Sequence, residues 1–253
     1  MFVRVSTSAL SLLALELAQA EPPPAKAALE PPKPEAHEVR TIEGWKVHVD
    51  TRLLPSRAED AFAGPVEILQ RRLADVRLVL PAATVARLQQ VPIWLDKTHG
   101  KLKPAQYHPS AGWLKENGYS VDLAKAVHIP HAGNYAEVRH QRVQPWSILH
   151  ELAHAYHDQV LGFEHAEIKQ AWETFRDSHK YDKTLHIEGG FTRHYALTNQ
   201  KEFFAEMTES YFGVNDFYPF NRAELKQAEP ELFEKMGRWW TVNAATPSQV
   251  KTP

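Results

Sequence analysis

The sequence contains no cysteine, and this absence removes several kinds of site at once. Disulfide bridges, thiolate nucleophiles and cysteine-ligated zinc sites are all excluded. Histidine and carboxylate side chains are then the only plausible protein ligands for a transition metal.

Neither sign of charge dominates the chain. It has 29 basic and 31 acidic residues, a formal net charge of −2 at pH 7, and the two signs are interspersed along its length. A large field of one sign, which would steer nucleic acid or an acidic membrane toward the protein, is not expected. We therefore expect no nucleic-acid partner.

Long apolar runs are also missing, and the N-terminal apolar stretch from Ala9 to Ala18 is too short to cross a membrane. Arg4 precedes this stretch, and Ala18-Gln19-Ala20 has the small-x-small pattern that signal peptidase reads. We expect residues 1–20 to be a removable signal peptide, and the protein to be secreted or periplasmic without membrane insertion after signal removal. A first helix of the fold is the alternative.

Proline is concentrated immediately after this segment, with six prolines between Pro22 and Pro34. Such a composition favours an extended, polyproline-type chain over packed structure. We expect a linker over residues 21–40, with a propeptide as the alternative.

The remaining chain is long and apolar enough for one sizeable core, and its hydrophobic periodicity predicts an α+β domain over residues 41–245 with a tail over 246–253. The C-terminal half is expected to be mainly helical, and residues 97–125 to be a long loop. We expect strands over 45–49, 91–95 and 126–129, and helices from Pro65 and over 82–90, 146–161, 166–178 and 199–212, then two more ending near Trp239 and Trp240.

Residues His150-Glu151-Leu152-Ala153-His154 carry the clearest chemical pattern. Helix positions four apart differ by about 40 degrees, so His150 and His154 face one ion from successive turns. Glu151 lies about 100 degrees round, off the metal but near a metal-bound water, where a general base is needed. The uncharged flanks indicate a buried helix, and burying these groups costs several kcal/mol unless they are paired or ligated.

A hydrolytic zinc site keeps three protein ligands and one open position, so a third ligand is required. Glu202 is the preferred candidate because it opens a second apolar helix that contains Phe203 and Phe204. Asn199 and Glu202 also fit a capping box, so a mere capping role stays open. The candidates that follow the motif are His157, Asp158, His165, His194, Glu202, Glu206 and Glu209.

The motif together with the segment from Tyr195 to Glu206 (YALTNQKEFFAE) resembles gluzincin-type zinc metallopeptidases, namely the catalytic domain of anthrax lethal factor and the Pro-Pro endopeptidase family. The Mlc titration factor A family is also similar in its Glu-Phe-Phe-Ala helix. The resemblance covers roughly residues 146–212. It implies a zincin-like domain, with a small mixed sheet and an active-site helix, in which residues 126–129 look like the edge strand that receives an extended substrate.

The resemblance also implies roles for individual residues. His150, His154 and Glu202 would bind Zn²⁺, Glu151 would act as the base, and Tyr195 would support the reacting carbonyl oxygen. The implied activity is hydrolysis of a peptide or protein substrate by a metalloendopeptidase.

Three further interpretations accompany these roles. Glu206 is a candidate partner for a zinc-bound histidine or a solvated charge, and His128 and His131 are candidates to line the cleft. A catalytically silent zinc-stabilised binding protein and a zinc hydrolase of a non-peptide substrate stay open as alternative functions, and the oligomeric state is not predicted.

Overall fold

The computed structural model describes residues 30–54, 64–102 and 104–241. The expected signal peptide over 1–20, the linker from 21 to 29 and the tail over 246–253 lie outside the described residues. The described chain is a mixed α+β structure with a small mixed sheet, as expected from the sequence. Within these ranges, no helix is both long and apolar enough to cross a membrane.

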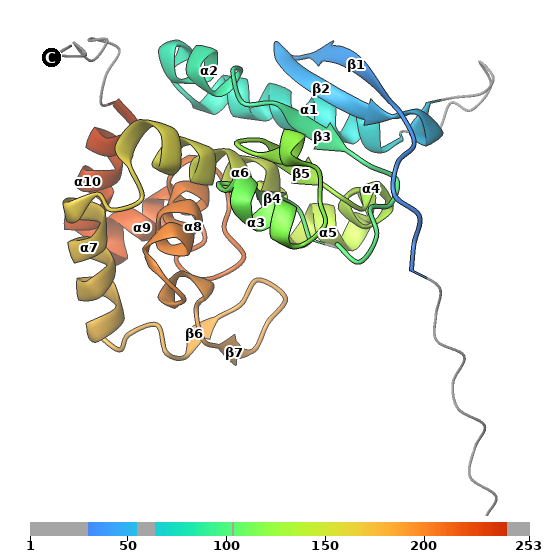
Figure 1. The fold of residues 1–253 in the computed structure, drawn as a ribbon. Coiled ribbons are helices and arrows are strands. Elements are labelled where there is room, and N and C mark those ends of the chain that lie inside the picture. The colour runs from blue at the N-terminus through green and yellow to red at the C-terminus, as the bar shows by residue number, and fades with distance from the viewer. Residues whose placement is uncertain (1–29, 55–63, 103, 242–253) are drawn as a thin grey trace, which may run out of the picture. The chain divides into compact units, whose positions relative to one another are not determined.

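The sheet has five strands in the order β1-β2-β3-β5-β4 (Figure 1). Strands β2, β3 and β5 run parallel to one another, whereas β1 and β4 pair antiparallel with their neighbours at the two edges. The strands are β1 (His37–Ile42), β2 (Trp45–Asp50), β3 (Ile93–Leu95), β4 (Gln106–Tyr107) and β5 (Val127–Ile129).

Strand β1 begins within the segment that was expected to be a linker, so the boundary at residue 41 is wrong. The turn residues Glu43 and Gly44 have φ values of 50° and 93°, and Ile42 faces Trp45 across the turn. Positive φ at both central residues is typical of a two-residue hairpin turn. Pairing with β2 orders β1, whose own sequence has little apolar alternation.

The outer strand beside the helical half is β4, not residues 126–129. Strand β5 pairs with β3 on one side and with β4 on the other, so it is internal. Strand β4 lies within the stretch 97–125 that was expected to be a loop. It has only two residues, too few for a period-2 pattern to be visible in the sequence.

Helices and one small hairpin are the other main elements of the described chain. Two short strands, β6 (Thr184–Leu185) and β7 (Phe191–Thr192), make a separate hairpin. The helices are α1 (Pro65–Val79), α2 (Ala82–Leu88), α3 (Ala111–Glu116), α4 (Ala132–Ala136), α5 (Val138–Val143), α6 (Ser147–Tyr156), α7 (Ala166–Asp177), α8 (Gln200–Phe212), α9 (Arg222–Ala228) and α10 (Pro230–Thr241).

Helices α6 and α8 pack against each other in the core, and α10 covers them with aromatic side chains. The Trp240 ring stacks on Tyr156 of α6, with ring centroids 4.4 Å apart, and on Phe204 of α8, with centroids 5.6 Å apart. All three rings are almost completely buried. This packing sets the relative position of α6 and α8, the helices that contain the sequence motifs.

Gly213 allows the end of α8 to approach the start of α6. A Cβ atom on Gly213 would lie 2.2 Å from Cε2 of Trp146, the residue that precedes α6. Carbon atoms in contact are normally about 3.5–4.0 Å apart, so an alanine could fit only if the indole or a helix moved.

We predict that Gly213→Ala lowers the free energy of unfolding by about 1–3 kcal/mol, as overpacking of a close contact does. Chemical denaturation with far-UV circular dichroism measures the change. Gly112→Ala is the matched control, because a Cβ there would meet only Ser110 Oγ at 3.6 Å. Equal stability of the two variants would contradict the proposed close contact.

Candidate metal centre

The two motif histidines project from α6 toward one carboxylate on α8. His150 and His154 have ring centroids 4.8 Å apart and ring planes at 82°. Their Nε2 atoms lie 3.2 Å and 3.4 Å from Oε2 of Glu202. These three residues could hold a metal ion. The structure therefore brings together the three residues that the sequence suggested as ligands.

Asn199 and Glu202 divide the two roles that the sequence left open. The Asn199 side chain caps α8 by accepting hydrogen bonds from the backbone N–H groups of Lys201 and Glu202, at 2.8 Å and 3.0 Å. The Glu202 carboxylate instead faces both histidines. The helix end is thus capped by Asn199, while the Glu202 side chain belongs to the group that could hold a metal ion.

The electrostatics of this group favour a positive charge. Burial by itself lowers the pKa of His150, but hydrogen bonds with Glu202 and Glu209 outweigh it and raise that pKa well above its ordinary value. Burial raises the pKa of Glu202. Hydrogen bonds with His150 and His154 have the opposite and larger effect, so this pKa lies well below its usual range. A proton or a metal cation can supply the charge that these contacts favour.

Glu209 orients His150 from behind. Its Oε1 lies 2.7 Å from Nδ1 of His150. Glu206 Oε1 lies 3.6 Å from the same nitrogen, and Glu206 Oε2 accepts a 3.0 Å hydrogen bond from the Asn215 side chain. Of the two interpretations left open for Glu206, neither fits the structure: its side chain is buried and not solvated, and its nearest oxygen is beyond hydrogen-bond distance of His150 Nδ1. Glu209, two helical turns after Glu202, is on the required face, and this spacing of seven could have been read from the sequence.

The Glu151 side chain connects α6 to the sheet. Its Oε2 accepts a 2.7 Å hydrogen bond from the backbone N–H of Tyr107 on β4. Burial raises the pKa of the Glu151 carboxyl. The contact with Tyr107 could not be predicted from the sequence, because a backbone donor carries no side-chain signal.

An open cleft of about 640 Å³ lies over this group. His150, Glu151, His154 and Glu202 line it, and so does Tyr195, which is 48% exposed in a short 3-10 helix before α8. Further lining residues are Pro104, Tyr107, His131, Tyr135 and Phe163. The cleft therefore joins the candidate ligands, base and tyrosine in one solvent-accessible space.

Several residues considered from the sequence lie elsewhere. His128 was a candidate to line the cleft, but it is completely buried and its Nε2 contacts Asp96 at 2.8 Å. His157 is buried in the π-helix that continues α6. Asp158 accepts a 2.6 Å hydrogen bond from the Tyr107 hydroxyl, and His194 Nδ1 accepts one of 3.1 Å from Ala196 N–H.

Sequence comparisons add no assignment to this geometry. No protein-family model matches the chain, and no curated protein matches its sequence. The chemistry of the site must therefore be argued from the residues and their positions.

We predict that Glu209→Ala weakens metal binding at the cleft about 10- to 100-fold, because it removes the group that orients His150. Glu209→Gln should lose less, since the amide oxygen can still accept a hydrogen bond from Nδ1–H. Competition with a chromophoric chelator at pH 7.5 measures the affinity. Glu206→Gln is the control, and an effect of that variant as large as that of Glu209→Ala would contradict the assignment.

Proposed function

We propose that this protein is a zinc-dependent metalloendopeptidase with a zincin-like domain, secreted or periplasmic. The observation that carries the proposal is the spacing of the three candidate ligand atoms. Bonds of about 2.0–2.1 Å at tetrahedral angles put the ligand atoms of a zinc ion about 3.3 Å apart. The separations from Glu202 Oε2 to the two imidazole nitrogens are 3.2 Å and 3.4 Å.

The number and chemistry of the ligands support a catalytic site over a purely structural one. Two imidazoles and one carboxylate make a donor set that zinc hydrolases use, and they leave a fourth position for water. All three residues line the cleft, so that position is accessible to a substrate. Glu209 behind His150 is the kind of outer contact that fixes a metal-bound histidine.

Zinc bound here would polarise a substrate carbonyl and lower the pKa of a water molecule toward neutrality. Glu151 would accept a proton from the attacking water and pass it to the leaving amine. The Tyr107 N–H holds one oxygen of this carboxylate at 2.7 Å. Tyr195, at the cleft, donates its hydroxyl proton in a hydrogen bond to the developing oxyanion.

Residues near the ligands favour an extended peptide or protein as the substrate. Strand β4 lies at the edge of the sheet, and its residues Gln106 and Tyr107 also line the cleft. An extended peptide can pair with the outer strand of a sheet. The resemblance of α6 and α8 to the gluzincin motifs agrees with this class of substrate.

We predict that Glu151→Gln binds zinc as the unaltered protein does but loses about 10²- to 10⁴-fold in turnover, because the amide cannot accept the proton. Glu202→Ala should lose or greatly weaken zinc binding and lose activity with it. Elemental analysis and cleavage of a mixed peptide library, followed by mass spectrometry, measure the two properties.

The results separate the alternatives. An active Glu151→Gln protein would remove Glu151 from the mechanism, and unchanged zinc in Glu202→Ala would remove Glu202 from the ligands. Zinc binding without hydrolysis of any peptide, ester or amide in the unaltered protein would support a zinc-stabilised binding protein. Hydrolysis of esters or amides alone would support a non-peptide substrate.

We also predict that Tyr195→Phe lowers kcat about 10²- to 10³-fold with little change in KM, since the phenol acts mainly on the transition state. Steady-state kinetics on a cleaved peptide test this. A matched control is Tyr119→Phe, a tyrosine that does not line the cleft. Unchanged kcat in Tyr195→Phe would exclude the tyrosine from the reaction.

A further inference from the structure

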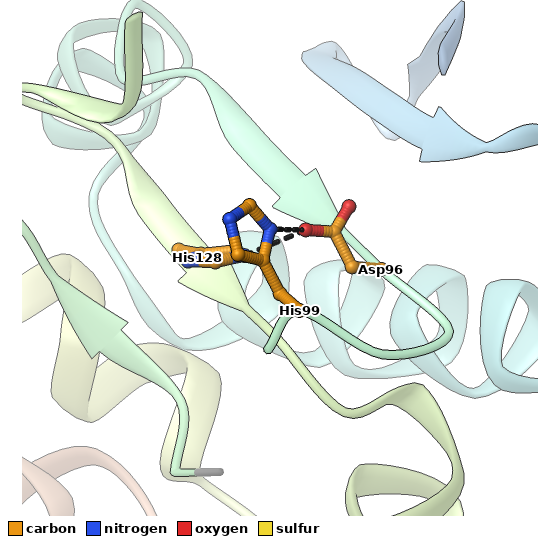
Figure 2. Close-up of side chains that lie close together, drawn as sticks. All are labelled: Asp96, His99 and His128. Atoms are coloured by element: carbon orange, nitrogen blue, oxygen red, sulfur yellow. Dashed lines mark hydrogen bonds and ion pairs between the residues drawn. The ribbon is translucent and has the colours of Figure 1, made fainter. Parts of the chain in front are cut away.

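A second group of metal-ligating side chains lies outside the cleft, at the end of strand β3 (Figure 2). Asp96 directly follows β3, His99 lies in the loop after it, and His128 comes from β5. Asp96 Oδ2 lies 2.6 Å from His99 Nδ1 and 2.8 Å from His128 Nε2. All three residues are buried, with Asp96 and His128 completely so.

Two further histidines contact this group from outside. His37, the first residue of β1, places Nε2 2.7 Å from Oδ1, the other oxygen of Asp96. His108 places Nε2 3.3 Å from Nδ1 of His128. Three imidazoles therefore contact the Asp96 carboxylate, two of them at Oδ2 and one at Oδ1, and a fourth imidazole contacts His128.

The three residues offer donor types that divalent transition ions bind, one carboxylate and two imidazoles. Asp96 offers Oδ2, and the ring nitrogens that face this oxygen are Nδ1 of His99 and Nε2 of His128.

The outer histidines occupy the positions of supporting groups. A metal-bound histidine commonly donates its other ring N–H to an acceptor, and His108 Nε2 can accept from Nδ1–H of His128. His37 can donate Nε2–H to the Asp96 oxygen that does not face the other two ligands. These contacts fix the orientation of Asp96 and His128 whether or not an ion is bound.

We propose that Asp96, His99 and His128 form a second transition-metal site, distinct from the cleft, that joins the end of β3, the following loop and β5. His37 and His108 support it. The Asp96 oxygen lies 2.6 Å and 2.8 Å from the two imidazole nitrogens, and a tetrahedral ion requires about 3.3 Å, so binding needs each of these pairs to separate by roughly half an ångström. Of the two histidines, His99 lies in the loop after β3, whereas His128 lies in strand β5.

The proposal is tested by zinc stoichiometry of the purified protein, measured by elemental analysis after equilibration with zinc and removal of free ion. We expect two zinc ions per chain. The His150→Ala/His154→Ala protein should keep one, His99→Gln should keep one, and the variant with all three changes should keep none. His48→Gln is the matched control, because His48 stacks on Trp94 in the same sheet and should leave two ions bound.

Cobalt titration of the metal-free protein gives a second measurement that requires no change in the cluster. Two equivalents with visible absorption are expected, and one should remain in His150→Ala/His154→Ala. A single ion that disappears in that double variant, or two ions retained by a folded His99→Gln protein, would overturn the second site. One ion that survives the double variant and is lost with His99→Gln would instead support this site and contradict the proposed cleft metal.

Discussion

The packing of α6 against α8 is the constraint on which the candidate centre depends. Neither helix contains a complete ligand set, because α6 supplies two imidazoles and α8 supplies the carboxylates. Trp240 stacks on both helices, and Gly213 lets their ends meet at Trp146. A small change in this packing would move Glu202 relative to His150 and His154. The aromatic core therefore contributes to the geometry of the site as well as to stability.

The same packing places an excess of carboxylates around few imidazoles. Burial raises the pKa of Glu206 and of Glu209, and also that of Asp216. Uncompensated buried carboxylates are destabilising, so this region favours protons or a cation. A metal ion at the cleft would relieve part of this cost, which couples metal binding to the stability of the helical half.

Strand β4, at the edge of the sheet, connects the sheet to helix α6. Tyr107 donates its backbone N–H to Glu151, and its hydroxyl to Asp158 in the π-helix that continues α6. Tyr107 also pairs with Val127 of β5, next to His128 of the Asp96 cluster. One short strand thus links the candidate base, the π-helix that continues α6 and the strand that carries His128.

The sequence alone predicted the α+β class, the main helices and the placement of His150, Glu151 and His154 on one helix, because helical periodicity and residue spacing are local properties. It could not decide whether Glu202 caps its helix or faces the histidines, since a spacing of three residues fits both. Strand β4, the edge of the sheet and the Asp96 cluster were decided by tertiary structure. Their residues are far apart in the chain, and strand pairing and burial bring them together.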